Sequence, residues 1–319
     1  MMLRSAILVG MFSVGLAPLL TAQDKAGFDP SKAEIAPIGL PSPYDKFLGL
    51  DQVLNLNYED WKAVYGEIAR DVDVSKYKEE TDAALALGVK IADGVMSIKA
   101  RDVQGLNDCS KQIEDLAKKL GVKDEDMTRA KTVRAHANKG EWLQVFMELG
   151  FLQTDIMKAL RAQGNAQRRS LIICAGWMQG LHYTSYVVKK HYSAPVSNYL
   201  REPLLVQAMQ KDLQSLPAAV KESPKVATII TEMGSMYTIV NIPIEGAIPK
   251  EGVEKLLDSS KAIVEKIVGN GKKLSRLLHG IHEHGKTPSS FANPQIHEKL
   301  HQTPHRRRAR ARHHHGPQG

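Results

Sequence analysis

The chain has 319 residues, of which 43% are hydrophobic, a formal net charge of +8 and only two cysteines. A chain of this length can bury a large core without help from disulfides. After residue 22, no stretch reaches the roughly 18 uninterrupted apolar residues of a membrane-spanning helix, which argues against a further membrane segment.

The basic character of the chain belongs to its last part. Residues 272–319 hold ten Lys and Arg residues and two Glu residues, so this segment alone accounts for the net charge of +8. The preceding residues hold equal numbers of positive and negative side chains. The body therefore lacks the basic face that nucleic-acid recognition requires, and we expect no specific nucleic-acid binding.

The first 22 residues have the features of a secretory signal peptide. Arg4 supplies a positive start, the stretch from Ser5 to Leu20 is uncharged, and Ala22 is a small residue suited to the last position before cleavage. Because the apolar run is short and interrupted by Gly15 and Pro18, a signal peptide is favoured over a membrane anchor. We expect a protein that is exported to the periplasm or outside the cell.

Residues 23–56 are rich in proline and glycine, which predicts an extended lead-in. Helical periodicity then begins, and caps mark where successive helices start. Predicted starts lie at Asn57, Ser75, Asp102, Asp124, Glu141, Ala166, Pro203, Pro224 and Pro249, with glycine stops at Gly121, Gly140 and Gly269. The segment VATIITEMGSMYTIV is β-branched, yet its apolar positions follow the 3.6-residue period, which predicts a helix.

Together these patterns predict an all-α protein. Residues 57–270 would form a multi-helix bundle or helical-hairpin array of about eight to nine helices, since short connections favour antiparallel neighbours. Residues 271–319 are basic, rich in His and interrupted by prolines, which predicts a disordered tail.

The two cysteines are Cys109 and Cys174, each on an apolar stretch. Export would permit a disulfide between them, whereas their apolar surroundings favour two buried thiols. Spacing alone does not decide between these alternatives.

The sequence offers no nucleophile elbow, phosphate-binding loop or dinucleotide fingerprint. Residues 297–301 read HEKLH and match the zinc-protease signature H-E-x-x-H. No Asp or Glu follows Glu298, and Pro304 would break a helix that presented His305 as a third ligand. We therefore interpret HEKLH as a chance match in a His-rich segment, and nothing else in the chain indicates an enzyme.

One helix does gather polar and aromatic groups that could hold a small molecule. The candidates for a ligand pocket are Trp177, His182, Tyr183, Tyr186 and Arg201. Gly176 and Gly180 share a face of the same helix and would let another helix or a ligand come close. The alternative, which the composition favours, is a central core helix packed closely on a neighbour.

The tail offers the other candidate site. Weak binding of Zn²⁺ or Ni²⁺, with no other cofactor, is expected from His297, His301, His305, His313, His314 and His315. The arginines of the same segment predict contact with anionic surfaces.

Three functions remain open at this point. The favoured one is an exported, non-enzymatic protein that binds a protein or envelope partner or acts as a scaffold. The second is a carrier of a small molecule or metal that uses the aromatic helix or the His-rich tail. The third is a hydrolase whose catalytic residues come from distant parts of the chain.

Overall fold

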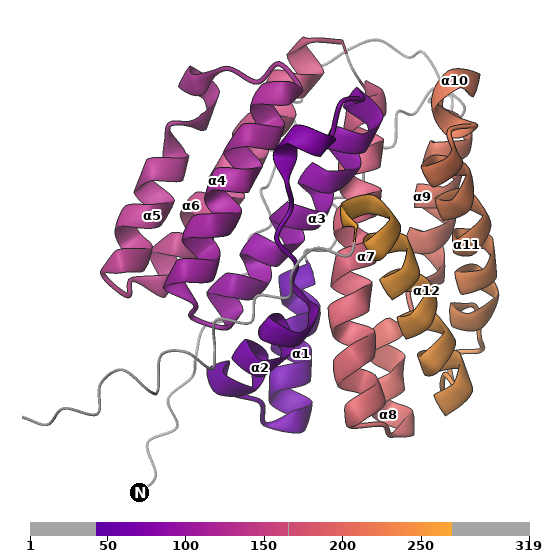
Figure 1. Ribbon diagram of the computed structural model, residues 1–319. Coiled ribbons are helices and arrows are strands. Elements are labelled where there is room, and N and C mark those ends of the chain that lie inside the picture. The colour runs from indigo at the N-terminus through magenta and orange to yellow at the C-terminus, as the bar shows by residue number, and fades with distance from the viewer. Residues whose placement is uncertain (1–42, 165, 270–319) are drawn as a thin grey trace, which may run out of the picture.

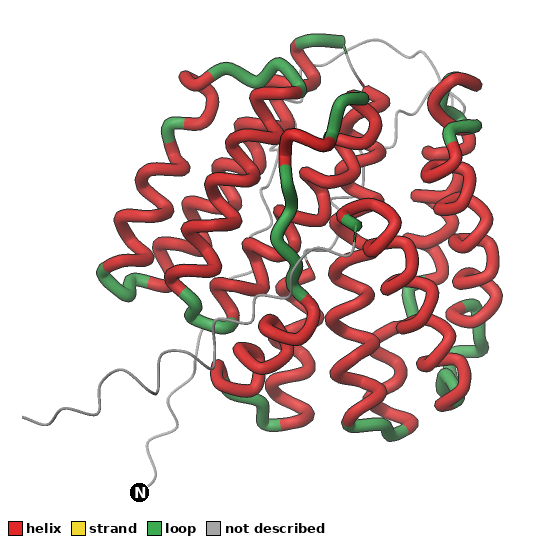
Figure 2. The backbone as a smooth tube through the Cα atoms, viewed as in Figure 1, coloured by secondary structure: helices red, strands yellow, loops and turns green. Residues whose placement is uncertain are grey.

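The computed structural model describes residues 43–164 and 166–269, and helices dominate both ranges (Figures 1 and 2). Neither range contains a β-strand, which confirms the predicted all-α class. The α-helices are α1 (Pro43–Leu54), α2 (Tyr58–Ile68), α3 (Glu80–Lys99), α4 (Val103–Lys119), α5 (Arg129–Asn138), α6 (Trp142–Ala162), α7 (Ala166–Lys190), α8 (Ala194–Ser197), α9 (Pro203–Gln214), α10 (Ala218–Lys221), α11 (Pro224–Val240) and α12 (Lys250–Val268). This is more than the eight or nine helices predicted, partly because α8 and α10 are single turns.

Helices α3 and α7 form the centre of the bundle (Figure 1). On one side, α4 packs on α3, and α5 and α6 follow as a hairpin at the edge of the molecule. On the other side, α12 packs on α7, and the hairpin of α9 and α11 lies outside it. Helices α1 and α2 cover one end of the central pair. The bundle therefore has two outer layers, one on each side of two buried helices.

The two central helices touch through their backbones at a pair of glycines. A Cβ atom placed on Gly88 of α3 would lie 2.1 Å from the carbonyl oxygen of Ile172 on α7, so any side chain there would force the two helices apart. Gly176 on α7 faces Gly88 in turn, with 3.1 Å between its Cβ position and the Gly88 oxygen. The predicted close approach of a second helix at Gly176 is thus what the structure shows.

Most predicted helix boundaries match the structure because local hydrogen bonds define them. The Asn57 side chain accepts from the backbone N–H groups of Glu59 and Asp60, and Asp60 in turn accepts from the Asn57 N–H. Asp102 caps α4 by accepting from the Gly105 N–H at 2.9 Å. At the other end of α4, Gly121 has a φ of +82°, a conformation that glycine adopts at little cost.

Two predicted starts are wrong in detail. Ser75 does not cap α3, because its hydroxyl donates to Asp73 within a short 3-10 turn, Val74–Lys76. Helix α3 instead begins at Glu80. Asp124 likewise opens a 3-10 turn, Asp124–Met127, and α5 begins only at Arg129.

The expected extended lead-in over residues 23–56 also needs correction, because residues 43–54 form α1. Phe47 and Leu50 lie one turn apart on this helix, and both are completely buried against the bundle. Their contacts with the core outweigh the weak helix preference of the surrounding prolines and glycines.

In the part of the chain that the structure describes, no helix combines the length and the apolar character needed to cross a membrane. The predicted signal peptide (1–22), most of the lead-in and the His-rich tail (271–319) lie outside the described residues.

Candidate functional site

The predicted ligand-pocket residues lie along α7 and just after it, and two of them are part of the core. Trp177 is buried, and its indole N–H donates to Glu202 at 3.0 Å. Glu202 also forms an ion pair with Lys46 of α1, whose ammonium group lies 5.8 Å from the centre of the Trp177 ring. Tyr183 is completely buried, and its hydroxyl donates to Asp93 of α3 at 2.8 Å. Both aromatic residues therefore hold α7 to its neighbours.

The other three candidates lie in different surroundings. His182 is 6% exposed, stacks on the Tyr183 ring, and its Nδ1 atom has no hydrogen-bond partner among the described residues. Tyr186 is half-buried and packs against the core. Arg201 donates from Nε to the backbone oxygen of Ile242 at 3.2 Å. The five residues are thus engaged with separate neighbours, and their role as a ligand pocket stays a prediction.

Burial strongly affects the protonation of His182. Removal from water lowers the pKa of its imidazole to about 4, and the positive charges of Arg70 and Lys261 act in the same direction. Asp93 opposes them but does not outweigh the burial. At neutral pH this histidine is therefore uncharged.

Next to Tyr183 lies a buried ionic cluster that the sequence reasoning missed. Lys90 and Asp93 of α3 are each 1% exposed, and their charged groups are 2.8 Å apart. Asp93 also accepts from Gln179 at 2.6 Å and from Tyr183, while Lys90 donates to the backbone oxygen of Arg70 at 3.1 Å. The available signal was two opposite charges, three residues apart, within a run from Ala83 to Ile98 whose only other polar side chain is Ser97.

The electrostatics of this cluster favour a charged Lys90 that stays paired with Asp93. Burial disfavours the charged form of Lys90, but the neighbouring acidic groups, Asp93 foremost, together outweigh it and raise the pKa of the ammonium group above its ordinary value. Burial, and then the negative charge of Asp93, raise the pKa of the Tyr183 hydroxyl. Neither group is poised to exchange protons near neutral pH, so the cluster suits a structural role better than acid–base catalysis.

The two cysteines are free and buried. The Sγ atom of Cys109 lies 3.3 Å from the Tyr65 hydroxyl, whereas Cys174 on α7 contacts the sulfur of Met233 at 3.6 Å. Burial raises the pKa of Cys109 to about 11 and that of Cys174 to about 12. These thiols are therefore protonated at neutral pH and act as small core residues.

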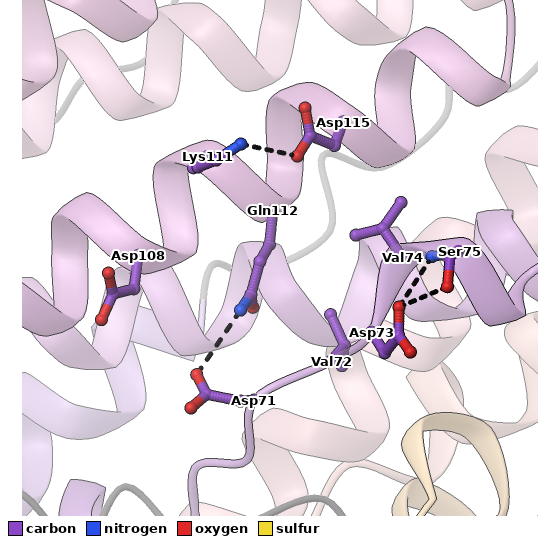
Figure 3. A pocket seen from close by; sticks show the side chains of 9 residues that line it. All are labelled: Asp71, Val72, Asp73, Val74, Ser75, Asp108, Lys111, Gln112 and Asp115. Carbon is purple, nitrogen blue, oxygen red and sulfur yellow. Dashed lines mark hydrogen bonds and ion pairs between the residues drawn. The ribbon is translucent and has the colours of Figure 1, made fainter.

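A cavity of about 410 Å³ opens between α4 and the connection that follows α2 (Figure 3). Four carboxylates, one ammonium group and the amide of Gln112 contribute to its lining, which comprises Asp71, Val72, Asp73, Val74, Ser75, Asp108, Lys111, Gln112 and Asp115. Several of these groups bond to one another, such as Lys111 to Asp115 at 3.3 Å and Gln112 to Asp71 at 3.5 Å. Among the described residues, no three His, Cys, Asp or Glu side chains come together to hold a metal ion.

The outer face of α6 carries an exposed row of large apolar side chains, which we call the α6 stripe. It consists of Leu143, Met147 and Phe151, which are 67%, 45% and 46% exposed. They are spaced four residues apart and therefore share one side of the helix. The opposite side packs into the core through Val145, Leu149, Leu152, Ile156 and Leu160.

The charges around the α6 stripe are unevenly placed. On one flank, Arg129 of α5 lies 4.9 Å from the centre of the Phe151 ring and pairs with Glu148 at 3.0 Å and Asp155 at 2.9 Å. Farther along the exposed face come Lys158 and Arg161, which we call the basic end. The two carboxylates between Leu143 and Arg161, Glu148 and Asp155, are only partly exposed, and both pair with Arg129. The helix thus presents an apolar half followed by a positive half.

Sequence reasoning missed the α6 stripe. The available signal was a second apolar row, Leu143, Met147 and Phe151, on the side of the helix that faces away from its buried residues. Of the polar residues on the same helix, Gln153 is exposed, while Asp155 is bound by Arg129.

In comparisons with known proteins, no protein-family model, no curated protein and no solved structure matches this chain.

Proposed function

We propose that the protein is an exported, non-enzymatic binding or scaffolding protein that acts in the cell envelope or outside the cell. The α6 stripe is the observation that carries this proposal. Soluble proteins seldom expose several large apolar side chains side by side unless the surface serves an interaction. Export rests on the composition of residues 1–22, where Arg4 precedes an uncharged apolar run.

The chemistry of the core supports the same proposal. The polar groups brought together around α3 and α7 are Lys90, Asp93, Gln179 and Tyr183, and they bond to one another rather than to an open cavity. Trp177 and Arg201, two of the predicted ligand-binding residues, are likewise engaged with protein groups. A surface function needs only that the bundle hold α6 rigidly, and the buried side of α6 does so.

The proposal is tested by placing a photo-crosslinking amino acid at Gln144, an exposed position beside the stripe. The matched control places it at Gln214, an exposed position on α9. Helix α9 lies on the opposite side of the bundle from α6 (Figure 1). The full-length protein is irradiated in the extracytoplasmic fraction of cells that produce it. We expect a discrete adduct from position 144 and none from position 214.

Two variants test whether the α6 stripe itself is responsible for the adduct. Phe151→Ser should remove the adduct, whereas Leu204→Ser, which changes an apolar side chain that is 81% exposed on α9, should leave it unchanged. An identical adduct pattern from positions 144 and 214, or no adduct from either, would contradict the proposal.

A further inference from the structure

We propose that the α6 stripe and its basic end receive an amphipathic partner helix that lies antiparallel to α6 and carries carboxylates in its first turn. This inference rests on the proposed binding function and specifies the chemistry of the partner. It is drawn from the layout of exposed side chains on α6, the charge at one end of that face, and an open glycine in its middle.

The dimensions of the face suit a helix. Leu143, Met147 and Phe151 repeat at the i, i+4, i+8 spacing by which helices recognise one another. From Leu143 to Arg161 the face is about 27 Å long at 1.5 Å per residue, which corresponds to a partner helix of about 18 residues. The stripe would contact the apolar side of that helix, and the basic end would contact its remaining turns.

Gly150 provides room for close contact. It lies on the exposed face between Met147 and Phe151, and a Cβ atom placed on it would meet nothing within 4 Å. Glycine inside a helix costs about 1 kcal/mol relative to alanine, so the position weakens α6 without serving its packing in the bundle. A small residue on a helix face lets a second backbone approach closely, as in other helix pairs with small interface residues.

Charge sets both the chemistry and the direction of the partner. Lys158 and Arg161 lie in the last two turns of α6, and neither forms an ion pair with another described residue. The nearest carboxylate on α6, Asp155, is held by Arg129, and the acidic 3-10 turn Asp124–Met127 packs on the same helix. Acidic side chains are most stable in the first turn of a helix, where they face the positive end of its dipole. When such a helix runs antiparallel to α6, its acidic first turn lies against the basic end. The two helix dipoles then point in opposite directions, which is favourable.

A second copy of this chain fits less well than an acidic helix. Antiparallel pairing of two α6 helices would bring each basic end close to Lys139 and Glu141 at the start of the other helix. Lys139 is exposed and positive, and Glu141 is already bonded to His136. A lipid surface also fits less well, because the positive charges gather at one end of the row instead of surrounding it.

The experiment uses the full-length protein and a fluorescently labelled, acetylated peptide of about 20 residues. The peptide carries two glutamates in its first turn and leucines at every fourth position of its second half. One control peptide has lysines in place of the glutamates, and a second has the glutamates moved to its last turn. Fluorescence anisotropy measures each dissociation constant at low and at high salt.

We expect the peptide with first-turn glutamates to bind about tenfold more tightly than either control, with a difference that shrinks as salt screens the charges. The double variant Lys158→Glu/Arg161→Glu should reverse the preference and favour the lysine peptide. Equal binding of all three peptides, or a charge reversal without effect, would overturn the proposal.

The variant Gly150→Gln distinguishes an effect on partner binding from an effect on folding. Because the space around the Gly150 Cβ position is open, this change should leave the melting temperature equal or higher, yet weaken peptide binding about tenfold. Unchanged peptide binding by this variant would contradict the close approach of a partner helix.

Two further measurements would identify a different occupant of the α6 stripe. Binding only to vesicles containing phosphatidylglycerol would indicate a lipid surface, and concentration-dependent dimers lost in Phe151→Ser would indicate a second copy. Either result would overturn the proposed helix partner. An adduct at position 144 without peptide binding would leave the proposed function standing and remove this inference, whereas absence of the adduct would remove the proposed function itself.

Discussion

At the scale of single residues, the charged and titratable groups inside the bundle have the largest consequences. A charge buried without its partner is far more costly than an exposed one, because water no longer solvates it. Lys90 and His182 avoid this cost in two different ways. Lys90 stays charged because Asp93 lies 2.8 Å away, whereas His182 stays neutral because burial lowers its pKa.

Replacing Lys90 by methionine should destabilise the fold strongly. The substitution leaves the Asp93 carboxylate buried without its cation, which should lower the free energy of unfolding by about 3–5 kcal/mol. Urea denaturation measures the change. The control is Lys111→Met, which breaks the exposed pair with Asp115 and should cost less than about 1 kcal/mol. Equal losses in the two variants would show that the buried pair is not the source of the effect.

His182 should make stability depend on pH between about 6.5 and 4. Its pKa is about 4 in the folded protein and near 6.5 in an unfolded chain, so acid protonates the unfolded state first. The stabilisation is fully present above pH 6.5 and is lost as the pH falls toward 4, by at most about 3 kcal/mol. Melting curves of the parent and of His182→Phe test this. The variant should lose less stability in that window, and parallel pH profiles would contradict the assignment.

At the scale of helices, the decisive feature is how closely each one approaches its neighbours. Gly88 and Gly150 are both helical glycines in outwardly similar sequence contexts, yet the first lies against the backbone of α7 and the second faces open space. The same residue type therefore serves packing in α3 and leaves an accessible surface in α6.

Alanine at these two glycines should act in opposite directions. Gly88→Ala would force a methyl group against the Ile172 carbonyl, and the separation of α3 from α7 should cost about 1–3 kcal/mol. Gly150→Ala should stabilise α6 by up to about 1 kcal/mol, because alanine is the better helix former and meets no neighbour. Thermal unfolding of both variants is the measurement. A stabilising effect at Gly88 would mean that α3 and α7 lie farther apart than described.

The sequence predicted most helices because caps and periodicity are local properties. Asn57 and Asp102 mark helix starts through side chains that accept from backbone N–H groups, Pro224 does so through its fixed φ, and the structure places starts there. Helix α1 was missed because its stability comes from the burial of Phe47 and Leu50 rather than from its own residues. The α6 stripe and the Lys90–Asp93 pair were missed because both depend on which side of a helix faces the core, and α3 and α6 carry apolar residues on more than one side.

At the scale of the whole molecule, the question is which parts belong to one cooperative unit. Helix α1 joins distant segments, because Lys46 pairs with Glu202 before α9 and Asp51 pairs with Lys99 at the end of α3. Asp51 also accepts from the indole N–H of Trp61 on α2. The folded body therefore begins before residue 57, where the sequence alone placed its start.

Truncation should reveal this contribution. A chain of residues 43–269 should unfold in one cooperative transition, with a mostly helical circular dichroism spectrum. A chain of residues 57–269 should melt at a lower temperature, because it exposes the surface that Phe47 and Leu50 cover and removes two ion pairs, Lys46 with Glu202 and Asp51 with Lys99. Identical melting temperatures would show that α1 is not part of the unit.

The His-rich tail should bind Zn²⁺ or Ni²⁺ weakly and without catalysis. Neutral imidazoles of His297, His301 and His305 and of residues 313–315 supply ligands, so binding should fade as the pH falls through about 6.5. Titration calorimetry compares the full-length chain with one ending at residue 269. Equal metal affinity would place the site in the body, and peptidase activity abolished by Glu298→Gln would overturn the interpretation of HEKLH as a chance match.

The buried cluster around Asp93 also bears on how the two central helices find their alignment. The backbone contact at Gly88 already disfavours a slide of α3 along α7, because the residues one turn away on α3 all carry a side chain. A slide of α3 by one turn, about 5.4 Å, would carry Asp93 out of reach of Gln179 and Tyr183. Only the native offset lets the carboxylate keep all of its partners, so we infer that the cluster and the Gly88 contact together fix the alignment of α3 on α7. Helix α6 packs on α3, so its placement depends on the same alignment.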